Sequence, residues 1–423
     1  MNQPTKPQKT DLFVSCVILA LGACPETVAY EPALVANSGV SSKGELLTID
    51  GIDQISMKRG DVLQTLSLRD FISWGTFPAP NSDSFVLLSD GSLLSAYVVG
   101  ITNDRLRVDS DLWGQQSLPL CAVRGIVFFP PSNERARRTL VRKLQADEPA
   151  SDVLVLANGD EIQGVVSGLD EEAVQVDTES RRLTFGRDNR PTAIKFCPAL
   201  TKMPTKPEAS LWIGFRDGSR LQSASAKFGK GPGQIELACG AKLETQFGAI
   251  WLEDCVFLQP QHDGIVYVSD KEPVAFRHQP ALVIPCPNQD DHNVAGGSLR
   301  CRGRYYRKGV GVRSDSQLVY SLNEQDERFR AVVAIDDTAH DSADAVFSVL
   351  FTNDGASWRV AKRTTVLRRG DEPVVIDVTI NGAKQIALAV DAVESAGVGD
   401  YANWLGACVL QSRPPTRSPR ARE

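Results

Sequence analysis

Short runs in which hydrophobic and polar residues alternate cover most of the chain, and this period-two pattern predicts half-buried β-strands. Three runs, at 85–88, 153–156 and 211–215, each lead into an Asp-Gly or Asn-Gly dipeptide, at 90–91, 158–159 and 217–218. Such a dipeptide is a strong hairpin signal because both turn positions need positive φ. The apolar pattern after each turn recurs at the same offset, so the sequence predicts a repeated β-unit.

Each predicted unit has four or five short strands, a size that favours a small SH3- or Sm-like barrel. We expect a degenerate half-unit plus the first repeat at 44–130, the second repeat at 151–200 and the third at 208–260. A connector helix is expected at 131–150. Ala136, Leu140 and Leu144 recur there every four residues, and the other positions are mostly basic. Two interpretations stay open: a connector packed on a barrel, or a surface helix that contacts anionic lipid or peptidoglycan-type polymers.

From residue 264 the pattern changes to longer strand-like runs separated by turn signals, among them 353–355 and 381–382. Strands at this spacing predict an antiparallel sandwich. The expected fold class is therefore all-β, with a C-terminal sandwich preceded by the repeated small barrels.

Five pieces of this C-terminal segment resemble one known family. They are the Gly-Gly-x-Leu lead at 296–299, the Lys-Gly-Val-Gly-Val-x-Ser run at 308–314, the strand-like run at 329–337, the Val-Phe-Ser-Val run at 346–349 and the closing Asp-Tyr-Ala-Asn-Trp at 400–404. Together, over 264–411, they resemble the NPCBM domain, a carbohydrate-binding module found in bacterial surface proteins. The resemblance implies a jelly-roll sandwich of the galactose-binding type with a sugar site among loops at one end. Arg313 and Tyr401 stand where the family usually has histidines.

A sugar site needs an aromatic face for C–H groups and polar groups that bond adjacent hydroxyls. We therefore expect carbohydrate binding among Tyr306, Lys308, Arg313, Ser314, Asp400, Tyr401, Asn403 and Trp404. Structural alternatives stay open. Trp404 could belong to the core, the glycine run could be a tight strand entry, and Arg313 could pair with an acidic neighbour.

Acidic residues and a histidine crowd the segment 336–344 and could hold a structural calcium ion, but their spacing matches no EF-hand and favours a solvated loop at a strand end. They are Asp336, Asp337, His340, Asp341 and Asp344. We expect no cofactor. The sequence has no HExxH, GxSxG or Walker motif, so we expect no catalytic role. A non-catalytic role as an accessory to a glycoside hydrolase stays open.

The first residues predict export. Lys6 and Lys9 precede an apolar run at 12–23, as in a signal peptide within 1–29. The run ends at Cys24 in a lipobox-like motif, with a competing cleavage after Ala29. We thus expect a periplasmic, cell-surface or extracellular protein whose only membrane contact is through an N-terminal lipid anchor.

The remaining cysteines suggest two disulfides to test, Cys239–Cys255 and Cys286–Cys301, with buried free thiols as the alternative. The tail 412–423 is rich in Arg and Pro and is expected to be disordered. A formal net charge of −6 argues against a nucleic-acid partner. The sequence predicts non-catalytic binding of a glycan or polysaccharide. The alternative is a surface scaffold that uses its β-repeats for protein contacts without binding sugar.

Overall fold

A computed structural model of the chain describes residues 32–39, 41–80, 83–146, 151–201, 207–229, 231–245, 252–279, 286–393 and 399–412. The predicted signal peptide, with Cys24, and the tail beyond Ser412 lie outside these ranges. The chain divides into the units Met1–Glu31 and Pro32–Glu423, and the following description concerns the second. No helix within the described ranges is long and apolar enough to cross a membrane.

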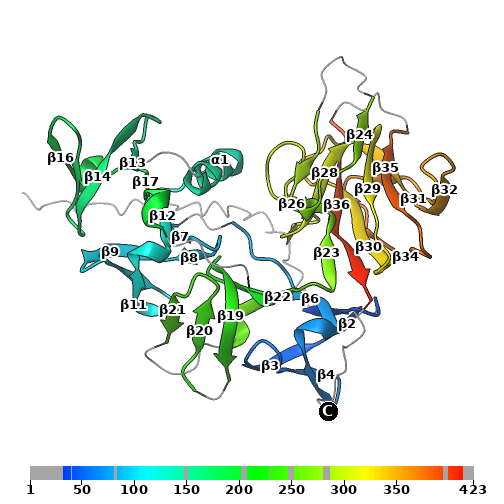
Figure 1. Cartoon of the computed structure of the whole chain (residues 1–423), viewed down its shortest axis with the longest axis horizontal. Coiled ribbons are helices and arrows are strands. Elements are labelled where there is room, and N and C mark those ends of the chain that lie inside the picture. The colour runs from blue at the N-terminus through cyan, green and yellow to red at the C-terminus, as the bar shows by residue number, and fades with distance from the viewer. Residues whose placement is uncertain are drawn as a thin grey trace, which may run out of the picture. The chain divides into compact units, whose positions relative to one another are not determined.

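Strands and a short 3₁₀ helix recur in the same order four times before residue 262 (Figure 1). The first copy contains β1 (Ala33–Ala36), β2 (Ser41–Lys43), β3 (Glu45–Asp50), β4 (Ile55–Arg59), β5 (Val62–Leu66), η1 (Leu68–Asp70) and β6 (Phe71–Gly75). The second contains β7 (Phe85–Leu88), β8 (Leu93–Ser95), β9 (Tyr97–Thr102), β10 (Arg105–Ser110), β11 (Gly114–Pro119), η2 (Leu120–Ala122) and β12 (Val123–Val127).

The third copy contains β13 (Asp152–Val155), β14 (Glu161–Leu169), β15 (Ala173–Asp177), β16 (Arg182–Gly186), η3 (Arg187–Asn189) and β17 (Ala193–Lys195), and η4 (Pro198–Leu200) follows it. The fourth contains β18 (Ser210–Phe215), β19 (Arg220–Phe228), β20 (Gln234–Leu237), β21 (Lys242–Glu244), η5 (Leu252–Asp254) and β22 (Cys255–Gln261). The expected half-unit is corrected, because its start at residue 44 leaves out β1, which pairs with both β2 and β6.

Antiparallel pairing joins the first and last strands of every copy: β1 with β6, β7 with β12, β13 with β17, and β18 with β22. The last strands of different copies also pair, β6 with β22 and β12 with β17. These pairings give β6, β12, β17 and β22 a partner on both sides and leave them no open edge for another chain.

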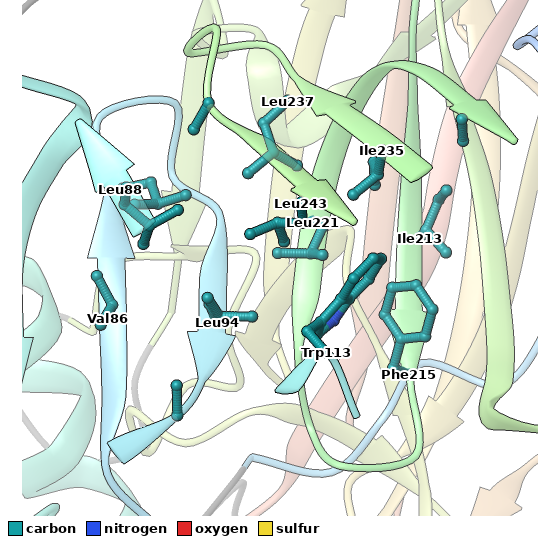
Figure 2. Close-up of a cluster of buried hydrophobic side chains, with 14 of the residues drawn as sticks. Val86, Leu88, Leu94, Trp113, Ile213, Phe215, Leu221, Ile235, Leu237 and Leu243 are labelled. Atoms are coloured by element: carbon teal, nitrogen blue, oxygen red, sulfur yellow. The ribbon is translucent and has the colours of Figure 1, made fainter. Parts of the chain in front are cut away.

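The second and fourth copies share one hydrophobic core (Figure 2). The Trp113 ring lies edge-on to that of Phe215, with centroids 5.5 Å apart, and Leu94 and Leu221 belong to the same buried cluster. Because a unit of this size buries little apolar surface by itself, the shared core adds burial to both copies.

The predicted connector helix is α1 (Glu134–Gln145). The Asn133 side chain caps its first turn by accepting a hydrogen bond from the Ala136 N–H at 3.0 Å. Leu140 and Leu144 are buried against Val127 and other apolar residues of the neighbouring strands. The apolar face therefore packs on the repeats, as the connector interpretation expects.

The C-terminal segment is a sandwich of two antiparallel sheets (Figure 1). The first, the β36 sheet, has the order β25 (Gln289–Asp290), β28 (Gly309–Arg313), β36 (Tyr401–Gln411), β30 (Asp326–Ile335) and β34 (Val374–Thr379), and β23 (Ile265–Tyr267) also pairs with β36. The second, the β35 sheet, has the order β24 (Ala275–His278), β29 (Ser316–Ser321), β35 (Gln385–Asp391), β31 (Asp344–Thr352) and β32 (Arg359–Arg363), and β33 (Leu367–Arg368) also pairs with β31.

A short hairpin of β26 (Leu299–Cys301) and β27 (Arg304–Tyr306) lies outside these two sheets, and η6 (Val268–Asp270) follows β23. The buried faces of the two sheets meet in one apolar core, in which the Trp404 ring lies edge-on to the rings of Phe329 and Phe347. The all-β prediction with a C-terminal sandwich is confirmed.

All seven cysteines in the described ranges are free thiols. The two suggested disulfides, Cys239–Cys255 and Cys286–Cys301, are not formed. Cys255, Cys301 and Cys408 are instead buried in the strands, as the alternative expected.

Burial raises the pKa of the Cys255, Cys301 and Cys408 thiols to about 12. Since the thiolate is the reactive form, these three should resist iodoacetamide at pH 8 in the native protein, while exposed Cys121 is alkylated. Mass mapping after alkylation, with a urea-unfolded sample as control, measures this. Native labelling of Cys408 at the rate of Cys121 would contradict the buried placement of β36.

Candidate functional site

Two of the motifs found in the sequence lie side by side because β28 pairs with β36 (Figure 1). The register sets Val310 opposite Trp404, Gly311 opposite Asn403 and Arg313 opposite Tyr401. Alternation then directs the side chains of Val310 and Trp404 into the core between the two sheets. Gly309 and Gly311 lie on the opposite face of the same sheet. The pairing explains why the glycine run and the closing motif belong to one structural feature.

The glycines let another part of the backbone lie directly on β28. A Cβ at Gly311 would come within 2.7 Å of the Asn293 Cα, and one at Gly309 would meet the Trp404 carbonyl oxygen. Gly309 also has a φ of 145°, which other residues rarely adopt. The run is thus a strand with close backbone contacts, one of the two interpretations that the sequence left open.

Asn403, an expected sugar ligand, is fully buried and holds the fold together. Its amide donates a hydrogen bond of 2.7 Å to the Asp336 carboxylate, which is also fully buried. The same carboxylate accepts bonds from the Asn293 amide at 3.1 Å and from the Thr338 backbone N–H at 2.9 Å. We call these four residues the Asp336 network. Asn403 is therefore corrected from ligand candidate to structural residue.

Three more expected ligands also have structural positions. The Lys308 ammonium lies 2.6 Å from the Asp270 carboxylate and 2.8 Å from that of Asp291, and the residue is buried. Trp404 is fully buried between the sheets. Tyr306, on the β26–β27 hairpin, packs against the cluster that contains Leu299. Lys308 and Trp404 are thus buried, while Tyr306 is half-buried on the hairpin.

The remaining four candidates gather where β28 ends and β36 begins, and we call them the loop-end cluster: Arg313, Ser314, Asp400 and Tyr401. The Ser314 hydroxyl donates to the buried Asp400 carboxylate at 3.0 Å. The Arg313 guanidinium lies over the Tyr401 ring, 5.5 Å from its centroid, and both residues are half-buried. The contact with the ring restricts the orientation of the planar guanidinium, whose outer N–H groups can donate to a ligand.

Arg313 supplies the positive charge of this cluster. Burial lowers the pKa of nearby His278, and the charge of Arg313 lowers it further while Asp315 opposes the change. His278 is therefore neutral at pH 7, and its Nδ1 accepts the Cys286 backbone N–H at 3.3 Å. The loop-end cluster thus offers one guanidinium and one phenol ring, with the neutral imidazole of His278 nearby.

No group of three or more His, Cys, Asp or Glu side chains in the described ranges is placed to hold a metal ion, so nothing in these ranges supports the calcium alternative. Asp337 instead accepts the backbone N–H groups of Arg302 at 2.6 Å and Gly303 at 2.8 Å. The solvated-loop interpretation also needs correction for Asp336, Asp337 and Asp344, because two are buried and Asp337 is half-buried.

Comparison with known proteins identifies the sandwich. Residues 264–410 match the profile of the NPCBM/NEW2 domain family. The C-terminal third of this chain is an NPCBM/NEW2 domain. A curated relative from Renibacterium salmoninarum, named as an endo-alpha-N-acetylgalactosaminidase, is 36% identical over 120 residues, which are 28% of this chain and 8% of that protein. The chain thus spans less than a tenth of that relative.

Solved structures with likeness to the chain include two from Clostridium perfringens. One is the CBM51 of GH95 in complex with methyl-galactose, at 22% identity and a TM-score of 0.30, covering 34% of this chain and 99% of that one. The other comprises the CBM51-2 and INT domains of ZmpB, at 23% identity and a TM-score of 0.31, covering 35% of this chain and 31% of that one. At these TM-scores neither structure adds to the description of the fold.

Proposed function

We propose that the NPCBM/NEW2 domain binds carbohydrate without cleaving it, through the loop-end cluster. The observation that carries the proposal is the pairing of Arg313 with Tyr401 across β28 and β36 in a domain of this family. Of the eight residues expected from the sequence, these two are half-exposed and lie in direct contact. The curated relative named as a glycosidase is consistent with a role in glycan recognition.

The chemistry of the cluster suits a sugar. A stacked guanidinium presents N–H donors in a fixed plane, which matches two adjacent hydroxyl oxygens. The part of the Tyr401 ring left uncovered can contact sugar C–H groups. The Ser314–Asp400 hydrogen bond holds the two strand ends together beneath them. The cluster therefore combines an orienting cation with a small aromatic surface.

We infer a non-catalytic role from the same residues. Hydrolysis of a glycosidic bond ordinarily needs two carboxyl groups that flank the bond. Asp400 is the one carboxylate of the loop-end cluster, and it is buried and bonded to Ser314. The chain could still act as an accessory to a separate glycoside hydrolase.

Binding by the intact protein to a glycan array tests this function. We expect a dissociation constant on the order of micromolar to millimolar for at least one array glycan. Arg313→Ala and Tyr401→Ala should each weaken it by about tenfold, because each removes one half of the stacked pair. Lys384→Ala serves as the control, since it also removes a positive charge from an exposed side chain. Lys384 precedes Gln385 at the start of β35. Val390, at the other end of that strand, is the residue that pairs with Ser316, near the loop-end cluster.

Absence of binding to every array glycan would contradict the proposed function. Binding that is equally strong in Arg313→Ala, Tyr401→Ala and the wild type would keep the function and reject the loop-end cluster as its site.

We propose further that the chain acts outside the cytoplasm, as its N-terminal sequence predicts. Lipidation at Cys24 and plain cleavage after Ala29 remain alternatives. Palmitate labelling in the bacterial host should disappear in Cys24→Ser if a lipid anchor is present. Labelling that persists in this variant would exclude an anchor at Cys24.

The alternative function, a scaffold that contacts proteins through the repeats, stays a prediction. The closing strands of the repeats already pair within the chain, so a protein partner would have to use other surfaces.

A further inference from the structure

The outer face of the β35 sheet carries a groove that the loop-end cluster does not use. Its volume is about 300 Å³, and residues from β24, β29, β35, β31 and β32 line it. Leu318, Phe347 and Leu388 on these strands face the core. By alternation, their neighbours Gln317, Ser348 and Ala389 face outward into the groove.

Strand register places five outward side chains in one row across the sheet. Gln317 lies opposite both Arg277 and Ala389, and Ser348 lies opposite both Ala389 and Arg363. The row therefore has an arginine at each end, with a glutamine, an alanine and a serine between them. With adjacent strands about 4.8 Å apart, it is about 19 Å long.

An apolar row lies next to this polar row. Ala275, Val319, Ala387, Leu350 and Val360 are paired in that order by the same strand registers. Leu350 and Val360, the latter 57% exposed, line the groove from this row. They give the groove a short apolar side.

Acidic and amide groups line the opposite side. The Asp391 carboxylate lies 3.5 Å from the Arg363 guanidinium, and Asp315 accepts the Ala392 backbone N–H at 3.1 Å. Gln279 lies beside them. Two arginines and two aspartates give this groove a formal charge of zero. It therefore offers both hydrogen-bond donors and acceptors without an excess of either charge.

Ser348 is the side chain in the groove that most clearly points to a ligand. The residue is 4% exposed, and its Oγ has no hydrogen-bond partner among the atoms of the described ranges. An unpaired hydroxyl at such a depth costs free energy on the order of 1 kcal/mol or more. A ligand hydroxyl in the groove would supply the missing partner.

We propose that this groove is a second glycan-binding site, which takes an extended neutral oligosaccharide laid across the strands. Sugar rings present C–H groups on their faces and hydroxyls at their edges, and the groove pairs an apolar row with a row of donors and acceptors. Its balanced charge favours a neutral chain over an acidic one. This inference rests on the proposed function but uses residues separate from the loop-end cluster.

Affinity electrophoresis of the intact protein, in native gels cast with galactomannan, arabinogalactan or xyloglucan, tests the groove. At least one of these polymers should retard the wild type. The double variant Arg277→Ala/Arg363→Ala should raise the apparent Kd by about tenfold, because both ends of the row lose their donors. Ser348→Ala should raise it by about threefold, since one buried hydroxyl loses its ligand bond.

The matched control is Arg359→Ala/Lys362→Ala, which removes the same amount of positive charge, here from β32 alone. These residues lie opposite core residues Phe351 and Val349, so their side chains face away from the groove. The control should stay within about twofold of the wild type.

Two outcomes would overturn the groove: unchanged retardation in Arg277→Ala/Arg363→Ala, or an equal loss of retardation in the control. If array binding depends on Arg313 in the presence of either of these, the proposed function stands and only the groove fails. If the protein binds neither an array glycan nor any gel polymer, both the proposed function and the groove are contradicted.

Discussion

Asp336→Ala should destabilise the NPCBM/NEW2 domain by about 3 to 5 kcal/mol. The carboxylate is fully buried and accepts hydrogen bonds from the amides of Asn293 and Asn403 and from the backbone N–H groups of Arg300 and Thr338. Alanine would leave these donors unpaired in the interior, and each unpaired buried donor costs about 1 to 3 kcal/mol. The Asp336 network joins three segments far apart in the sequence, so its loss should loosen all three.

Hydrogen exchange in the intact protein measures this effect within the domain. The opening free energy of the amides in β30 and β36 should fall in Asp336→Ala. Asp341→Ala, in the same loop, should leave it unchanged, because the Asp341 side chain is 89% exposed. Equal protection in Asp336→Ala and the wild type would show that the network does not hold the sheet.

Trp404→Ala should destabilise the same domain by about 3 to 5 kcal/mol, because it removes the largest side chain from the core. The Trp404 ring is fully buried, with its centroid 5.3 Å from that of Phe347 and 6.4 Å from that of Phe329. Small neighbouring side chains cannot fill the space that alanine leaves. The expected effect is a loss of stability and not a specific loss of sugar binding.

Trp404→Phe is the control for this interpretation. The indole Nε1 is buried without a hydrogen-bond partner among the described atoms, so phenylalanine loses no hydrogen bond and retains most of the apolar contact. Urea denaturation followed by hydrogen exchange in β36 should rank the proteins wild type, Trp404→Phe, Trp404→Ala. A Trp404→Ala protein of normal stability that no longer binds glycan would contradict this interpretation and would support Trp404 as a sugar-binding residue.

The sandwich was predictable from the sequence because each of its strands has a local sequence signal. Alternation, turn dipeptides and the ordered family motifs are all short-range signals, and they identified both the C-terminal domain and helix α1. The first barrel copy was underestimated because β1 lacks a preceding turn signal and is recognised only by its pairing with β6.

The candidate site was harder to predict, because burial of a polar residue depends on partners distant in sequence. Asn403 and Lys308 look like ligands in the sequence, yet Asp336 and the pair Asp270 and Asp291 occupy their polar groups. Only the register between β28 and β36 separates Arg313 and Tyr401 from these structural residues. The groove of the β35 sheet gave no motif at all, since its side chains come from five separate strands.

A co-crystal structure of the intact protein with its tightest array glycan would locate the bound sugar. We expect sugar density in contact with the Arg313 guanidinium and the Tyr401 ring. Density confined to surfaces that include neither residue would contradict the loop-end cluster as the binding site of the NPCBM/NEW2 domain.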